Sequence, residues 1–422
     1  MLNWQGGLSQ WYPRISEADI FFFNNKSAFF GTRGDRTPVD LEVHQPVTAK
    51  FVTGLVCLFL STLVKFMFKK FLLVNFCLVL ILPARAAELF NSEQNKMDFY
   101  GKLKASRILL TKNNPGDITY FRTGIKAQAY INSAIISYSQ AEFQFNGSKT
   151  EGNSGAEKNR LIFSGLDFGR WGSIDYGRNR GVIYDVGSYT GVLPEFGNDS
   201  FQYADNYMNN RTAGVMTYRN NNMPWILESV CLTLQLQGKN EQATRSQLYR
   251  NGRGYGFSLQ YTFGQSGMSI GGAASHSATF ADVKDLTVRR KNPSKSADAW
   301  VAGVKYRDHD IYLALIMSVT RHMTVIGREE KKIADKTESL EAIVQRQLDN
   351  GLRISLGYIG ANSIIDSQTA WATHYVTTGI TYCLNSNLNL DIVHKFNNIR
   401  VADKKFTKNN EDALIMGITY QF

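Results

Sequence analysis

The feature that most constrains this chain is an alternation of apolar and polar residues that recurs from residue 97 to the C-terminus. In residues 97–105 the odd positions are apolar or small and most even positions are charged, and residues 121–129 again place polar residues at even positions. Successive side chains of a β-strand point to opposite faces, so each such segment has one apolar and one polar face. The alternation therefore predicts strands, in either a soluble sandwich or a membrane barrel.

Three further observations favour the membrane barrel. A secretion signal, described below, directs the chain outward, and no apolar run after Glu88 reaches the length of about 20 residues that a membrane-spanning helix needs. The last segment ends the chain on an aromatic carboxylate, and its apolar face consists of Leu414, Met416, Ile418, Tyr420 and Phe422. Roughly sixteen strand-like segments, separated by alternating short turns and longer polar loops, fit such a barrel. Because an open sheet edge cannot be satisfied in lipid, the barrel is expected to close.

The leader carries the secretion signal. An apolar run, residues 71–82, follows Lys69 and Lys70 and ends near the small-residue sequence Ala84–Ala86. A basic start, an apolar centre and an A-x-A sequence are typical of a secretory signal peptide. We therefore predict a signal peptide over residues 67–86, with an N-terminal membrane anchor as the alternative.

Met67 stands where a signal peptide normally begins, just before the two lysines. Residues 1–66 show no clear periodicity and are expected to be an over-extended, non-native N-terminal segment of the reading frame. The mature protein is then expected to consist of residues 87–422, a single barrel domain.

Composition agrees with an all-β protein. Aromatic residues make up 12% of the chain, with 35 Gly and only 8 Pro, and aromatics favour strands whereas proline interrupts their ladders. The formal charge of +11 raises the question of nucleic-acid binding. Most basic residues are scattered singly, however, and the dense runs at 289–291 and 331–332 lie in polar stretches expected to be loops, so no nucleic-acid partner is predicted.

The cysteines and histidines do not predict a reactive site. No CxxC or Cys/His spacing surrounds the four Cys, so no metal and no cofactor are predicted. Cys231 and Cys383 could pair in an oxidising compartment, but each lies in a separate strand-like segment. The six His are dispersed without a nucleophile motif, so the chain is not expected to be an enzyme and no catalytic residues are assigned.

Specific sequence motifs indicate which kind of membrane barrel this is. Residues 175–179 (DYGRN), 181–186 (GVIYDV) and 192–197 (VLPEFG) together resemble the third-loop region of enterobacterial general, non-specific diffusion porins of the Gram-negative outer membrane. Shorter matches, such as residues 237–240 (QGKN), extend the resemblance over about residues 87–422. It implies a 16-stranded antiparallel transmembrane β-barrel with an inward-folded third loop.

The same resemblance implies function and partners. The expected activity is passive diffusion of small hydrophilic solutes and ions through a homotrimer in the bacterial outer membrane. Outer-membrane lipid, lipopolysaccharide and the barrel-assembly machinery are the implied partners. The machinery is expected to recognise the C-terminal Phe422.

The resemblance also implies a constriction of the pore. Its wall cations fall on Lys102, Arg122, Arg160 and Arg211, and its loop carboxylate falls on Glu195. A lipid-facing arginine near the membrane centre would cost about 2–4 kcal/mol, which independently favours inward placement of the arginines.

Two positions beside the third-loop motifs depart from the family pattern, and both are expected at the constriction together with Tyr184, which lies within the second motif. Gly191 stands where an aspartate is expected, and Arg180 adds a cation to the loop where the family usually has an uncharged residue. We therefore expect a pore of weak selectivity or one tilted toward anions. A substrate-specific channel, for example for sugars, is the main alternative; a barrel enzyme and a receptor or adhesin role of the long loops are others.

Overall fold

The computed structural model describes residues 87–111, 116–150, 157–201, 207–221, 229–240, 250–279, 288–289, 296–327, 331–399 and 411–422. All of them belong to one compact unit. The expected signal peptide and the segment before it lie outside the described residues.

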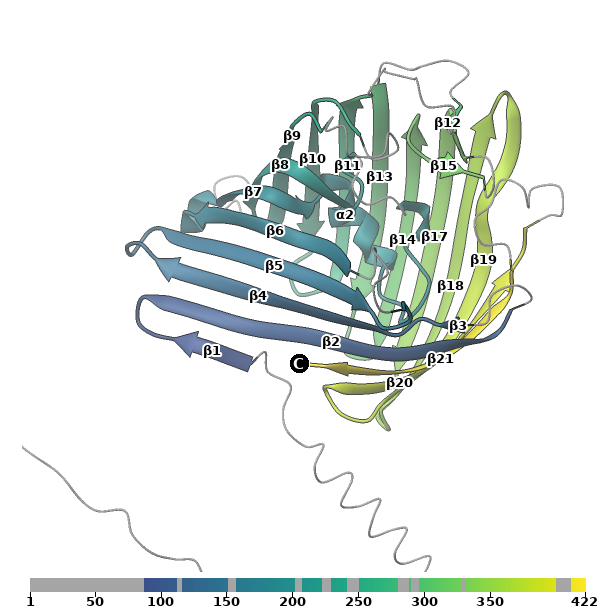
Figure 1. Ribbon diagram of the computed structural model, residues 1–422, viewed down its shortest axis with the longest axis horizontal. Helices are drawn as coiled ribbons and strands as arrows, with labels where there is room; N and C mark the ends of the chain where they lie inside the picture. Colours follow the sequence, from purple (N-terminus) through teal and green to yellow (C-terminus); the bar gives the residue numbers. More distant parts are fainter. Residues whose placement is uncertain are drawn as a thin grey trace, which may run out of the picture. The chain divides into compact units, whose positions relative to one another are not determined.

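The described unit is a closed antiparallel barrel (Figure 1). Each strand pairs with the next along the chain, and the last strand pairs with β2, which closes a barrel of 16 strands as the sequence predicts. The barrel strands are β2 (Asn95–Leu110), β4 (Tyr120–Tyr130), β5 (Ile136–Asn146), β6 (Glu157–Asp167), β7 (Ser173–Arg180), β8 (Arg211–Asn220), β9 (Val230–Gln237), β10 (Gly254–Thr262), β11 (Met268–Ala278), β13 (Ser296–Arg307), β14 (Ile311–Arg321), β17 (Lys336–Gln347), β18 (Leu352–Ile365), β19 (Gln368–Cys383), β20 (Leu388–Asn397) and β21 (Ala413–Gln421).

Smaller elements complete the unit. β1 (Ala87–Asn91) and β3 (Gly116–Asp117) pair with β2, while β12 (Val288–Arg289), β15 (Val325–Ile326) and β16 (Lys331–Ile333) form a separate small sheet. The helical elements are η1 (Gly169–Trp171), α2 (Val182–Gly187), η2 (Ser188–Thr190) and η3 (Asp199–Phe201). Within the described ranges, no helix is long and apolar enough to cross a membrane.

Burial along the strands is the reverse of that in a soluble protein. On β14, Leu315 and Met317 are 40% and 62% exposed, whereas their neighbour Ile316 is buried. The other face is polar on many strands, with buried side chains such as Thr217 and Gln235. An apolar exposed wall around a polar interior is the pattern of a barrel whose outer surface contacts lipid, and it excludes the soluble sandwich.

The C-terminal residue takes part in closing the barrel. The Phe422 N–H donates to the Gly101 carbonyl oxygen at 3.0 Å, and the Gly101 N–H donates to the Phe422 carbonyl oxygen at 2.9 Å. The Phe422 ring packs beside Phe99, with ring centroids 5.5 Å apart. A β-carbon on Gly101 would lie 2.4 Å from this ring, so the close approach requires glycine.

The two cysteines of the barrel do not form a bond. Cys231 and Cys383 are free thiols, and their strands, β9 and β19, are not neighbours in the sheet. Cys231 and Cys383 therefore do not form the disulfide that the sequence left open, because the barrel holds these two strands apart.

Candidate pore constriction

The described part of the segment between β7 and β8 packs against the inner face of the barrel. The α2 side chains Val182, Ile183 and Val186 are fully buried, and α2 contacts β9, β10, β11 and β13. A β-carbon on Gly256 of β10 would lie 2.6 Å from Val182, so this glycine lets the helix approach the wall. These contacts are consistent with the inward-folded third loop that the sequence predicts.

A buried carboxylate on β17 anchors this loop. Glu341 is fully buried and accepts hydrogen bonds from the backbone N–H groups of Asn198 and Ser200, both at 3.0 Å. It also accepts from the hydroxyl groups of Thr190 and Ser200. A buried charge needs such compensation, so the four donors account for its position.

A second anchor lies on β19. The Gly197 N–H donates to the Tyr375 hydroxyl oxygen at 3.0 Å, and that hydroxyl donates to the Asp199 carboxylate. The Phe196 ring meets the Tyr375 ring edge-on, with centroids 6.0 Å apart. The loop is thus held at strands far from β7 in the sequence.

The expected loop carboxylate has a basic partner that sequence reasoning missed. The Lys104 Nζ lies 2.6 Å from Glu195 Oε1 and donates to the Pro194 carbonyl oxygen, also at 2.6 Å. Lys104 is only 1% exposed. Its charge therefore compensates that of Glu195 locally. The alternation in the sequence assigns Lys104 to the polar face of β2 but does not identify this partner.

The expected wall cations lie near one another. Lys102 stands opposite Arg122 across β2 and β4. Arg211 stands opposite Arg180 across β8 and β7. The guanidinium charges of Arg122, Arg160, Arg180 and Arg211 interact with one another, and Lys102 interacts with Arg122 and Glu195. The structure thus brings these residues of distant segments into one cluster, which we call the basic wall: Lys102, Arg122, Arg160, Arg180 and Arg211.

Only one member of the basic wall has an acidic partner within ion-pair distance in the described part of the chain. Arg160 pairs with Glu142 of β5, a buried residue that sequence reasoning did not single out. The Gln144 Oε1 accepts from both Arg122, at 3.0 Å, and Arg160, at 3.3 Å. The other members have no carboxylate at ion-pair distance among the described residues, although Glu195 and Asp391 act on Lys102 over a longer distance.

Arg180 is not part of the loop, contrary to the expectation, but is the last residue of β7. Its guanidinium lies 4.0 Å from the centroid of the Tyr184 ring on α2 and donates to Asn210 Oδ1 at 2.8 Å. A cation over an aromatic face is held in place by the ring electrons. Tyr184 thus positions this wall cation.

Gly191 is exposed and ends η2 with φ −82°, a value that any residue adopts. A β-carbon there would lie 3.3 Å from the Ser188 carbonyl oxygen and 3.5 Å from Asn198 Nδ2. The site can therefore accept an aspartate with small adjustments.

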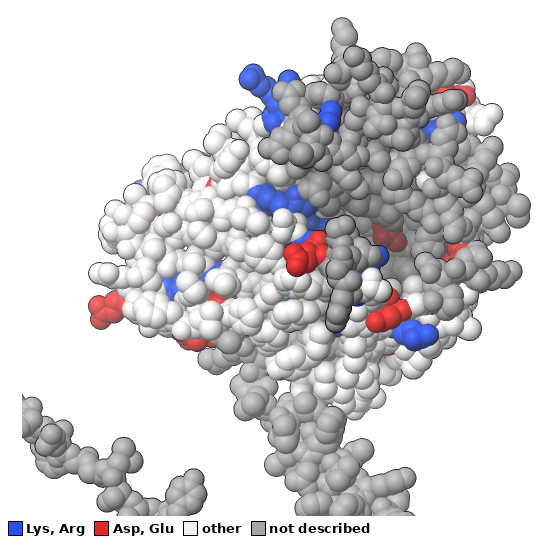
Figure 2. Space-filling view, viewed as in Figure 1, with Lys and Arg blue, Asp and Glu red and all other residues white. Residues whose placement is uncertain are grey.

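A polar cavity of 610 Å³ lies between the β4–β7 wall and α2. Both signs of charge line it, including Lys126, Asp175, Arg180 and Asp185. Figure 2 shows Lys, Arg, Asp and Glu side chains gathered around the hollow at the centre of one face. No group of three potential metal-binding side chains occurs among the residues described.

Comparison with known proteins decides the family. The family model described as Gram-negative porin matches residues 92–422. The chain belongs to this family. It is 39% identical over 341 residues to the outer membrane porin PhoE of Escherichia coli K12, covering 80% of this chain and 95% of PhoE. It is 36% identical over 364 residues to the putative outer membrane porin NmpC of the same strain, covering 82% and 96%.

The solved structure of Salmonella typhi OmpF in complex with daunomycin is similar, with a TM-score of 0.73 and 32% identity. It is covered completely, by 79% of this chain. This porin is therefore a multi-pass β-barrel of the bacterial outer membrane. It forms a passive diffusion pore for small hydrophilic solutes and ions, and its relatives are channel proteins rather than enzymes.

Proposed function

We propose that the constriction of this porin is formed by the basic wall on one side and the inward-folded third loop on the other, and that it is weakly selective or tilted toward anions. Charged side chains at a narrow point determine which ion is admitted. The observation that supports this most directly is the ion pair between Lys104 and Glu195, which leaves the expected acidic side of the throat locally neutral. Lys102, Arg122 and Arg211 meanwhile have no acidic partner at ion-pair distance in the described segments.

The loop position Gly191 supports the same proposal because it supplies no second carboxylate. A matched pair of variants tests it in planar bilayers under a salt gradient. Gly191→Asp adds a negative charge and Arg122→Ala removes a positive one, so both should move the reversal potential toward cation selectivity. Thr378→Leu, on the exposed outer face, is the control and should not move it. If neither charge variant changes the potential, these residues do not form the throat.

The remaining parts of the proposal concern assembly and maturation. We infer a homotrimer, a mature N-terminus at Ala87 after removal of residues 67–86, and insertion by the barrel-assembly machinery into a membrane that contains lipopolysaccharide. Family membership supports the trimer. The A-x-A sequence before Ala87 supports the cleavage.

A further inference from the structure

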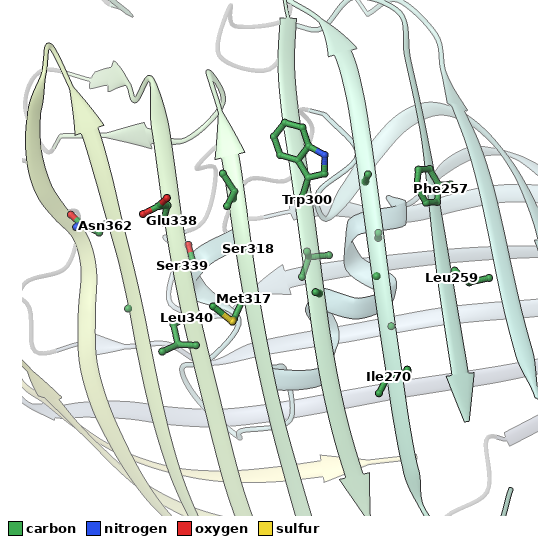
Figure 3. Close-up of a pocket in the computed structure, with 18 of the residues that line it drawn as sticks. Phe257, Leu259, Ile270, Trp300, Met317, Ser318, Glu338, Ser339, Leu340 and Asn362 are labelled. Atoms are coloured by element: carbon green, nitrogen blue, oxygen red, sulfur yellow. The ribbon is translucent and has the colours of Figure 1, made fainter. Parts of the chain in front are cut away.

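A groove of 1050 Å³ is present on the exposed outer wall, over the neighbouring strands β10, β11, β13, β14, β17, β18 and β19 (Figure 3). Its floor contains the small residues Gly272 and Ala302. Large, exposed apolar side chains stand around the floor, among them Leu259, Met317 and Leu340. The groove exists because small residues occupy outward positions where neighbouring strands carry large ones.

Strand register arranges the outward side chains around the groove in rows. The row nearest the long connections is charged and contains His276, Asp298, Arg321 and Lys336. The next row is mixed and contains Phe257, Ala274, Trp300, Val319, Glu338 and Asn362. The third row is apolar and contains Leu259, Gly272, Ala302, Met317, Leu340 and Gly360. From the long connections inward, the order of the three rows matches the order of headgroup, interface and hydrocarbon in a bilayer.

The charged row contains one cation without an acidic partner at ion-pair distance among the described residues. His276 Nδ1 lies 2.6 Å from Asp298 Oδ1, and Lys336 Nζ lies 2.5 Å from Glu338 Oε1. Arg321 stands in register beside Asp298, and its guanidinium lies 5.6 Å from the centroid of the Trp300 ring. Arg321 is therefore the cation best placed to meet an anionic headgroup above the groove.

We propose that this outer-wall groove holds one acyl chain of a phosphate-bearing lipid of the outer leaflet, whose phosphate contacts Arg321. The proposal rests on the outer-membrane location of the barrel and is independent of its ion selectivity. A thin, flexible acyl chain can reach the floor at Gly272 and Ala302 and restore the dispersion contacts that a void there would lose. The Trp300 ring stands at the headgroup end, where tryptophans prefer to lie.

To test this, the full mature protein is reconstituted in phosphatidylcholine vesicles that contain lipid A. The protein is then extracted in detergent, and native mass spectrometry measures how much lipid A stays bound. Wild type should retain one lipid A per chain. Gly272→Leu should abolish retention, because a β-carbon there lies 3.8 Å from its nearest neighbour, the Val301 carbonyl oxygen, and the new side chain fills the groove without a clash. Thr378→Leu, also outward on the wall but outside the groove, should retain lipid A as wild type does.

A second variant tests the headgroup contact. Arg321→Gln should weaken retention about fivefold, the effect expected for one basic residue beside an anionic lipid surface. Equal retention by wild type and Gly272→Leu, or equal retention of dephosphorylated lipid A, would overturn the proposal. So would efficient cross-linking of two chains through Gly272→Cys, which would show that a second copy covers the groove. Unchanged single-channel conductance of each variant confirms that the barrel is folded and keeps this test separate from that of the throat.

Discussion

Replacing Lys104 with methionine tests whether its ion pair with Glu195 controls the charge of the throat. Methionine keeps an unbranched side chain of similar size but removes the ammonium group that lies 2.6 Å from Glu195 Oε1. An ion that passes about 5 Å from the freed carboxylate, in water, interacts with it by about 0.8 kcal/mol, which is about fourfold in local concentration. Since salt screens charges over about 10 Å at 0.1 M, we expect the cation-to-anion permeability ratio to rise at least about twofold.

The assay is the reversal potential across a planar bilayer under a salt gradient. Glu195→Gln, which leaves Lys104 without its carboxylate, should move the potential in the opposite direction, toward anions. The double variant should return close to wild type, because the two charges cancel in the native pair. If Lys104→Met leaves the potential unchanged, or if the double variant behaves like Lys104→Met alone, the ion pair does not control the charge of the throat.

Three other predictions concern the loop anchor and the chain ends. Glu341→Gln replaces an acceptor-only carboxylate with an amide, so at least one buried donor loses its partner at a cost of about 1–3 kcal/mol. Single-channel current records should therefore show more frequent fluctuations, and a record as quiet as that of wild type would contradict the role of Glu341 as a loop anchor. Deleting Phe422 removes its two backbone hydrogen bonds with Gly101 and should lower the yield of heat-resistant trimer in outer membranes, whereas an unchanged yield would show that this end is dispensable. Mass spectrometry of the outer-membrane protein should find Ala87 at the N-terminus, and retention of residues 1–66 would disprove the proposed maturation.

The barrel could be predicted because its signal is local. Alternation within each strand depends only on neighbouring residues, and the apolar face of the last segment and the short turns are likewise visible in sequence. The alternation, together with the cost of charge in lipid, predicts the inward face for Arg122. It fails for Arg160, because Ile162 and Leu166 occupy the exposed even positions of β6 and the β5–β6 pairing skips Arg160 at a register shift. The sequence motifs shared with the family then indicated the position of the third loop.

The partners of these residues could not be predicted because they depend on strand register and loop path. Glu142 pairs with Arg160 at the register shift between β5 and β6, which lies between Glu142 and Phe143. Glu341 meets Asn198 across 143 residues of chain. Alternation places such carboxylates on the polar face without showing what they bind. The assignment of Arg180 to the loop was wrong because β7 continues to that residue.

If cations without an ion-pair partner govern the throat, the reversal potential of the wild-type protein shows it most directly. The purified mature trimer would be inserted in a planar bilayer with a tenfold gradient of potassium chloride, whose two ions have nearly equal mobilities. A potential of the sign that marks anion preference, or one close to zero, is the predicted result. Strong cation selectivity would contradict the account, because it would require unpaired carboxylates in the throat that outweigh Lys102, Arg122 and Arg211.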